Sequence, residues 1–415
     1  MKRSFAWIGV LLAALQVQAG EAQLQQSLRE WQQQLAEYRA ALSLASTEEQ
    51  REALTPPSPD EVAPKIWRAV SGVTGRKMLA TKDKKEKREV ASYEFEEAWA
   101  APAVIWLLQY PEAFAKVLES KPTDLAYFAQ RILNSVYNEH YSAPGIAEAC
   151  PKLAESTSDQ GYKILEKIYE HNKDPKARSC AALALSICLS RPTMASAEGG
   201  YARTRSKRIY YLKQALSIAP GDTMFGAVTL TQAAEEQIYN LRNLSTGSIP
   251  PRMTLTDPTS GSKKLFPQEG KPNLIFFWSP AEEVGLRMMS KQSSLQKRYP
   301  GLVLCPVIPY GEAEEVVGIM QENNIATCYL DDEQGTAGKD YRVSQLPLAV
   351  LVDARAHILY IGYPDMQLQS ALENLFTTEN QAPAKRPAAT NQRPAAPAAA
   401  QGSDIPPSLR EMPQF

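Results

Sequence analysis

The first apolar pattern of the 415-residue chain is a seam with alternating spacings of four and three residues. It runs through Leu24, Leu28, Trp31, Leu35, Tyr38, Leu42 and Ala45. An a/d seam of about three heptads predicts an amphipathic helix over residues 20–54. Three heptads is the minimum for a coiled coil, so we favour packing of this helix on the next domain over dimerisation.

Proline then interrupts the helical pattern. The stretch TPPSPDEVAP (Thr55–Pro64) predicts a linker, and residues 55–92 are expected to hold this linker and one helix. The mixed charge run KDKKEKRE (Lys82–Glu89) is typical of a solvated helix face rather than of a binding patch.

Residues 93–247 show helix after helix and predict an all-α domain. Asp174 and Pro175 supply an N-cap and a proline at the first helical position, ahead of KARSCAALALSICLS. The small residues of that run predict a narrow helix at the centre of the domain, because neighbouring helices can approach it closely.

One stretch of this domain, IYYLKQALSIAPGD (Ile209–Asp222), resembles the end of a tetratricopeptide repeat. Ala215 would be the small packing residue and Pro220 the terminator of the helix. No second copy occurs at a period of about 34 residues. A helical, repeat-like array therefore stays an alternative to an unrepeated helical domain.

The period changes again between residues 248 and 377, where short apolar runs alternate with helical patterns at 281–298, 313–322 and 367–375. This alternation predicts an α/β domain with a partly parallel sheet. The predicted strands are 274–278, 302–308, 326–330, 348–352 and 358–361. The Pro-, Ala- and Gln-rich tail, 378–415, predicts disorder.

Charge and targeting features narrow the function classes. The 45 Lys and Arg residues nearly balance the 46 Asp and Glu residues, so no long-range field would attract nucleic acid or a membrane surface. Lys2 and Arg3, the apolar run Phe5–Leu15 and the small-residue site Val17–Ala19 are typical of a signal peptide over residues 1–19. No later apolar run of about 18 residues predicts a membrane span. The mature chain is therefore expected in the periplasm or outside the cell.

The segment 248–376 resembles the TlpA-like thioredoxin family, whose members are exported. The stretches SIPPRMTLTDPTSGSKKLFPQEGKPNLIFFWS and YLDDEQGTAGKDYRVSQLPLAVLVDARAHILYIGY carry this resemblance. They follow the family's order of a Gly-Lys-Pro step, a central strand ending in Phe-Trp, a proline before a strand and a last strand ending at Gly362. The resemblance implies a thioredoxin-like (redoxin) fold, preceded here by a helical domain.

In that family Phe-Trp is followed, two residues on, by Trp-Cys-x-x-Cys, and the resemblance places the two cysteine positions on Glu282 and Gly285. A carboxylate can neither attack a disulfide nor resolve a mixed one, so no catalytic residue is expected. Ser279-Pro280-Ala281-Glu282 instead predicts a capping box, in which Ser279 and Glu282 bond each other's backbone N–H groups.

Pro347 matches the family's proline that faces this corner, usually through a cis peptide bond. The resemblance implies that Pro347 and its neighbours line a groove for an extended chain. A simpler interpretation, which we favour here, is that Pro347 shapes the turn into its strand. The candidate binding corner consists of Trp278, Ser279, Glu282, Gly285, Leu346 and Pro347.

Other chemistries find little support in the sequence. The five cysteines are too few for a disulfide framework and are expected to be buried small hydrophobes. Neighbouring strands would allow a structural disulfide between Cys305 and Cys328. His140, His171 and His357 lack metal-ligand spacing, and Asp331-Asp332-Glu333 indicates a solvated turn rather than a cation site. No metal or cofactor is expected.

The leading hypothesis is an exported, redox-inactive thioredoxin-like protein that binds or scaffolds a protein or peptide partner in the cell envelope. The alternative is a thiol–disulfide oxidoreductase that uses Cys305 and Cys328. A third possibility is that the helical domain carries the main function and the thioredoxin-like domain is ancillary.

Overall fold

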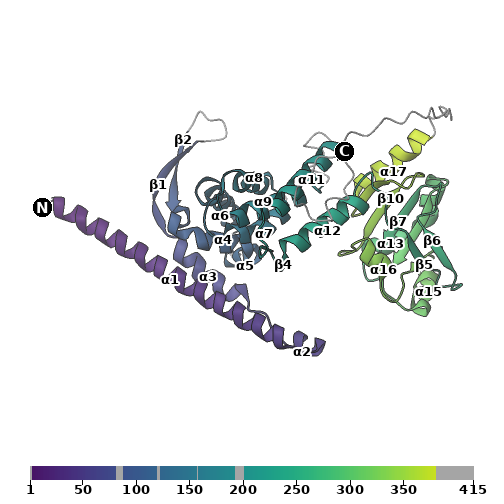
Figure 1. Cartoon of the computed structure of the whole chain (residues 1–415), viewed down its shortest axis with the longest axis horizontal. Helices are drawn as coiled ribbons and strands as arrows, with labels where there is room; N and C mark the ends of the chain where they lie inside the picture. Colours follow the sequence, from purple (N-terminus) through teal and green to yellow (C-terminus); the bar gives the residue numbers. More distant parts are fainter. Residues whose placement is uncertain (1, 81–86, 119–121, 157, 192–200, 380–415) are drawn as a thin grey trace, which may run out of the picture. The chain divides into compact units, whose positions relative to one another are not determined.

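A computed structural model describes residues 2–80, 87–118, 122–156, 158–191 and 201–379 (Figure 1). The predicted tail, 378–415, lies outside these residues except for its first two. The chain divides into two compact units, one up to residue 234 and one from residue 235 onward. We describe each unit by itself.

The first unit begins with the long helix α1 (Lys2–Leu44), which packs against α3 (Pro59–Val70). Leu24 and Trp31 of the apolar seam are buried, and the Trp31 ring lies edge-on to the Trp106 ring, with 5.8 Å between centroids. The first half of the seam therefore packs on its own domain.

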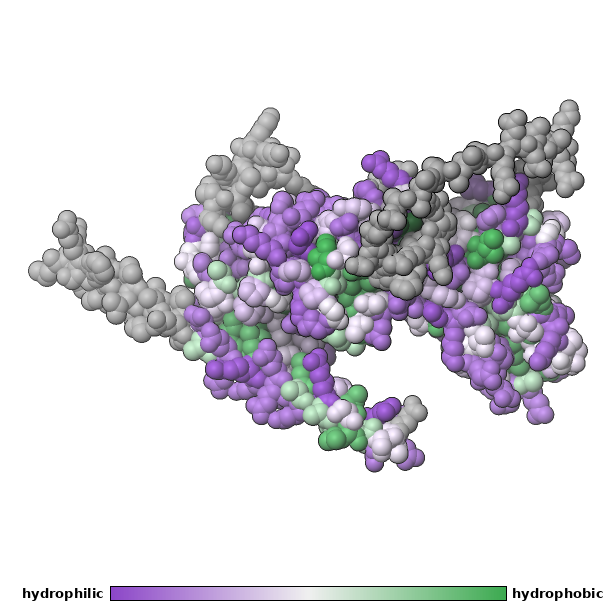
Figure 2. All heavy atoms as spheres, viewed as in Figure 1, coloured by the Kyte–Doolittle hydropathy of each residue, from purple (hydrophilic) through white to green (hydrophobic). Residues whose placement is uncertain are grey.

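The other end of α1 is more exposed. Figure 2 shows apolar residues gathered where α1 leads into α2 (Glu48–Glu52), and Leu44 there is 83% exposed. The signal peptide stays a prediction.

Two expectations for residues 55–92 are wrong. Ser58 caps α3 and Pro59 occupies its first turn, so the second half of the expected linker is helical, because proline fits the first turn of a helix without losing a hydrogen bond. Lys87–Glu89 lie in a strand, not on a helix face: β1 (Val73–Ala80) and β2 (Lys87–Tyr93) form an antiparallel hairpin. Residues 82–86 of that charge run lie outside the described residues.

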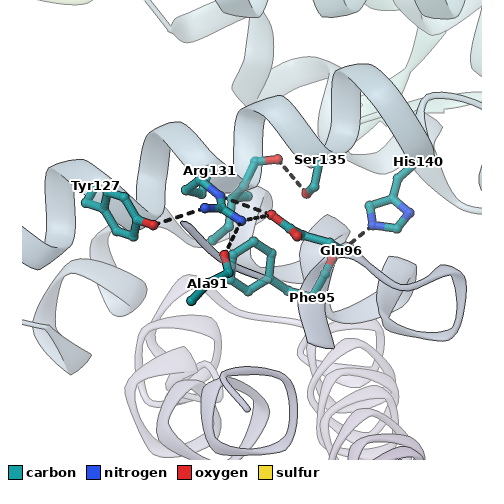
Figure 3. Close-up of polar contacts among 8 residues, drawn as sticks. Ala91, Phe95, Glu96, Tyr127, Arg131, Ser135 and His140 are labelled. Carbon is teal, nitrogen blue, oxygen red and sulfur yellow. Dashed lines mark hydrogen bonds and ion pairs between the residues drawn. The ribbon is translucent and has the colours of Figure 1, made fainter. Parts of the chain in front are cut away.

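A buried ion pair fastens the base of this hairpin to the helices (Figure 3). Arg131 of α6 (Pro122–Ser135) donates to the carboxylate of Glu96, to the backbone carbonyl of Ala91 in β2 and to the hydroxyl of Tyr127. The Arg131 and Glu96 side chains are only 6% and 11% exposed. The contact explains why β2 ends against the helical domain: its last residues supply a backbone acceptor to a buried guanidinium.

The centre of the first unit is α9 (Pro175–Cys188), as predicted. Every residue from 179 to 186 is buried. The helices α7 (Cys150–Glu155), α8 (Asp159–His171) and α11 (Tyr201–Ile218) pack around α9. Asp174 caps α9 by accepting from the backbone N–H of Lys176, which confirms the predicted start. The unit also contains α4 (Ala101–Gln109) and α5 (Pro111–Val117). Its short elements are the 3-10 helices η1 (Glu94–Glu96), η2 (Ala98–Ala100) and η4 (Ile146–Ala149) and the π-helix η3 (Val136–His140).

The local features of the repeat-like stretch are present. Ala215 is fully buried and α11 ends at Ile218, just before Pro220. A two-stranded hairpin, β3 (Met224–Phe225) and β4 (Val228–Thr229), then leads to α12 (Leu230–Asn243). A repeat array stays a prediction.

The second unit contains a seven-stranded mixed sheet in the order β11-β10-β7-β8-β9-β5-β6. Only the β7–β8 and β8–β9 pairs are parallel, which confirms the expected partly parallel sheet. The strands are β5 (Met253–Thr256), β6 (Lys263–Phe266), β7 (Asn273–Phe277), β8 (Val303–Ile308), β9 (Tyr329–Leu330), β10 (Leu348–Val352) and β11 (Ile358–Gly362). The helices are α13 (Glu283–Met289), α14 (Gln292–Arg298), α15 (Ala313–Glu322), α16 (Thr336–Asp340) and α17 (Met366–Glu379).

This arrangement is the thioredoxin-like fold that the sequence predicted. The central strand β7 alternates its side chains between two cores, with Leu274 and Phe276 on one face and Ile275 and Phe277 on the other. The peptide bond before Pro347 is cis.

The single helix expected over 281–298 is two helices. The break lies at Ser290 and Lys291, directly before Gln292, which is buried and exchanges hydrogen bonds of 2.7 and 3.1 Å with the backbone of Thr327.

Candidate functional site

A groove of about 670 Å³ lies where the end of β7 faces the loop before β10. Four chain segments build it: the turn after β7, the end of β8, the loop from Arg342 to Pro347, and the end of β11. Its lining is Glu282, Pro309, Tyr310, Arg342, Val343, Ser344, Gln345, Leu346, Pro347, Leu348, Gly362 and Tyr363. The volume falls in the range of sites that hold small ligands or a few residues of a peptide.

The structure brings only half of the predicted corner into this groove. Glu282, Leu346 and Pro347 line it, and Ser279 does not. Trp278 is fully buried in the core beneath the corner and cannot touch a partner.

Gly285 is also buried, against Trp278. A Cβ at Gly285 would lie 3.2 Å from the Trp278 Cβ, closer than ordinary van der Waals contact. A side chain at the second cysteine position of the resemblance would therefore press against Trp278.

The predicted capping box between Ser279 and Glu282 does not form. The backbone N–H of Glu282 donates to the carbonyl of Ser279 (3.1 Å), and the Ser279 hydroxyl accepts from the N–H of Ala281 (3.3 Å). A tight turn therefore occupies the positions expected to be the first helical turn, and α13 begins only at Glu283. Glu282 is its N-cap residue and makes no side-chain capping bond.

The Glu282 carboxylate is unusual for a half-buried acid. Its Oε2 atom is shielded from solvent and has no hydrogen-bond partner among the described residues. The neighbouring carboxylate of Glu283 points elsewhere and pairs with Arg287 one turn along α13. Glu282 thus presents an uncompensated negative charge at the groove.

The other charged residue of the lining is already engaged. Arg342 Nε donates to Glu236 Oε1 (2.6 Å), and its Nη1 donates to the carbonyl of Lys339 (2.7 Å). The guanidinium also lies over the Tyr239 ring, 4.1 Å from its centroid. The positive charge of Arg342 is therefore balanced inside the protein.

Two exposed tyrosines flank the groove, and sequence reasoning missed both. Tyr310 is 79% exposed and Tyr363 is 53% exposed. Tyr310 follows the end of β8 and Tyr363 follows the end of β11. The sequence could have predicted that both tyrosines lie beside the groove, because each follows the end of a strand and such residues meet at one edge of the sheet.

None of the five cysteines lines the groove. Cys305 and Cys328 are free, buried and on opposite faces of the sheet, so the suggested pairing is wrong. Burial raises the pKa of Cys305 well above its usual value and that of Cys328 to about 12, which keeps both thiols protonated. Cys150, Cys180 and Cys188 are likewise free and buried, as expected.

Other candidate ligands are accounted for by local structure. The Asp331 carboxylate accepts the N–H groups of Ala337 and Gly338, and Asp332 accepts those of Gln334 and Thr336, so this turn caps α16. In the described part of the chain no three His, Cys, Asp or Glu side chains gather as metal ligands do. Within the same residues, no helix combines the length and apolarity that crossing a membrane requires.

Comparison with known proteins finds similar solved structures only. The thioredoxin domain of a thiol-disulfide oxidoreductase from Bacteroides vulgatus aligns at 20% identity over 32% of this chain and 98% of that one, with a TM-score of 0.29. A thiol-disulfide oxidoreductase from Bacteroides fragilis aligns at 16% identity over 30% and 97%, with a TM-score of 0.28. A secreted Mycobacterium tuberculosis disulfide oxidoreductase aligns at 17% identity over 30% and 96%, with a TM-score of 0.27.

No family model and no curated protein matches the chain. The assignment of the thioredoxin-like fold therefore rests on the strand order and on the parallel β7–β8 pair.

Proposed function

We propose that the second unit binds an extended segment of a partner protein in the groove beside Pro347 and does not carry out thiol–disulfide exchange. One observation carries the proposal: an open groove on a thioredoxin-like fold has a carboxylate, Glu282, where the resemblance places the nucleophilic thiol. Each of the five cysteines is buried elsewhere.

The shape and chemistry of the groove suit an extended chain. Residues 344–347, which form part of its wall, belong to no helix or strand, so no sheet ladder occupies their backbone groups, and these groups can pair with a peptide as in β-strand addition. Tyr310 and Tyr363 offer rigid aromatic surfaces with a polar tip, the side chains that dominate protein contacts.

Export to the cell envelope belongs to the same proposal. It is supported by the signal-peptide pattern of residues 1–19. In that compartment a thioredoxin-like domain without an accessible thiol can hold a partner segment without reducing it.

Two measurements test the proposal. Purified protein should reduce insulin disulfides no faster than a cysteine-alkylated sample, and turnover above that control would refute redox inactivity. A panel of extended peptides should bind the wild-type chain and bind Y310S and Y363S more weakly. Tyr210→Ser is the matched control, because Tyr210 is 50% exposed on the first unit. Equal losses in all three variants would refute the groove as the binding site.

A further inference from the structure

We infer that the segment bound in the groove places a basic side chain, lysine or arginine, against the carboxylate of Glu282. This inference rests on the proposed function and adds the chemistry of the partner. A basic partner side chain is particular to this chain, because the redox proteins that it resembles carry a thiol at the same position.

The first support is the state of the Glu282 carboxylate. Its Oε2 is covered by protein without receiving a hydrogen bond from any described residue, while the residue as a whole is half-buried and lines the groove. A carboxylate that has lost water without gaining a donor is destabilised. Because its charge is shared between both oxygens, a cation that reaches the groove side of the carboxylate stabilises the whole group.

The second support is the balance of charge in the groove. Glu282 and Arg342 are the two charged residues of its lining. Arg342 already has Glu236, a backbone carbonyl and the Tyr239 ring as partners. The charge left for a ligand is therefore negative, and it favours a positively charged side chain over a neutral or acidic one.

The third support is the contrast between two adjacent acids. Glu283 carries the same charge one residue later, but its side chain is 83% exposed and paired with Arg287. Glu283 has a partner within its helix, whereas Glu282 lines the groove and has no such partner among the described residues. This pair also gives a matched control for mutation.

The test uses the full-length mature protein and capped, labelled peptides about ten residues long, enough to span roughly 33 Å when extended. The peptides share one sequence of serines and leucines and differ only at the central residue, which is lysine, norleucine or glutamate. Fluorescence anisotropy gives Kd for the wild-type chain, E282Q, E282K and E283Q, and circular dichroism checks that each variant is folded.

The lysine peptide should bind the wild-type chain about tenfold or more tightly than the norleucine peptide, as expected for a charge-assisted hydrogen bond. That preference should vanish in E282Q, reverse toward the glutamate peptide in E282K and persist in E283Q. A lysine preference that survives in E282Q, or the absence of any preference in the wild-type chain, overturns the inference and leaves the groove as a binding site. If none of the peptides binds, the proposed function itself fails, and this inference with it.

Discussion

The close approach of Gly285 to Trp278 predicts that a single methyl group at this position destabilises the second unit. A Cβ at Gly285 would lie 3.2 Å from the Trp278 Cβ and 3.4 Å from both its Cε3 and the Ser279 carbonyl oxygen. Trp278 is fully buried among the residues of one core and has little freedom to move.

The size of the effect follows from two opposing contributions. Replacing a helical glycine by alanine stabilises a helix by about 0.5–1 kcal/mol. Inserting a carbon into a packed core costs about 1–3 kcal/mol. The second contribution is larger, so Gly285→Ala should lower the free energy of unfolding by about 1 kcal/mol.

Gly318 provides the matched control, because it lies within α15 of the same unit and a Cβ there meets no atom within 4 Å. Gly318→Ala should therefore stabilise the unit by about 0.5–1 kcal/mol. Urea unfolding followed by hydrogen–deuterium exchange of peptides from β7 and β10 reports the second unit alone. If both variants are stabilised equally, Trp278 can shift to accept a Cβ, and the reasoning from the close approach at Gly285 is wrong.

Three further predictions concern buried polar groups. Arg131→Met should cost about 3–5 kcal/mol, because it removes the guanidinium that pairs with the buried Glu96 carboxylate. The double variant R131M/E96Q should recover part of this loss in urea unfolding followed by tryptophan fluorescence, and an equal loss in both variants would contradict this cause. The thiols of Cys180 and Cys328 have pKa values raised by burial to about 12, so the free energy of unfolding should fall as the pH rises from about 9 toward 12, and less steeply in C328A. Burial lowers the pKa of His140, whose Nε2 lies 3.0 Å from the Phe95 carbonyl. Only the unfolded state then takes up this proton just below pH 6.5, so the free energy of unfolding should fall as the pH drops through that range, and H140N should show a smaller fall.

Much of the architecture was predictable because it depends on local patterns. The capped start at Asp174 and the run of small residues identified α9 and its central place. The alternation of apolar runs with helical patterns after residue 248 identified the mixed sheet. In both cases the spacing of apolar residues along the chain matches the period at which a helix or a strand buries its side chains.

The errors arose where a distant contact outweighs a local preference. The charge run ending at Glu89 indicated a helix, yet β2 forms because β1 pairs with it and Arg131 bonds its carbonyl at Ala91. The residues Ser279 and Glu282 matched a capping box, yet a tight turn delays the helix to Glu283. Such outcomes depend on partners far along the chain, which a local pattern does not contain.

By itself, the sequence determined the class of the fold and the absence of the usual cysteine pair, because both follow from residue types and their spacing. Only the tertiary structure decided which residues form the groove. It buried Trp278 and Gly285, left Glu282 half-buried in the lining of the groove, and added Tyr310 and Tyr363 from the ends of two other strands. The physical reason is that a groove is the surface left between packed elements, and its lining depends on how the sheet brings separate segments together.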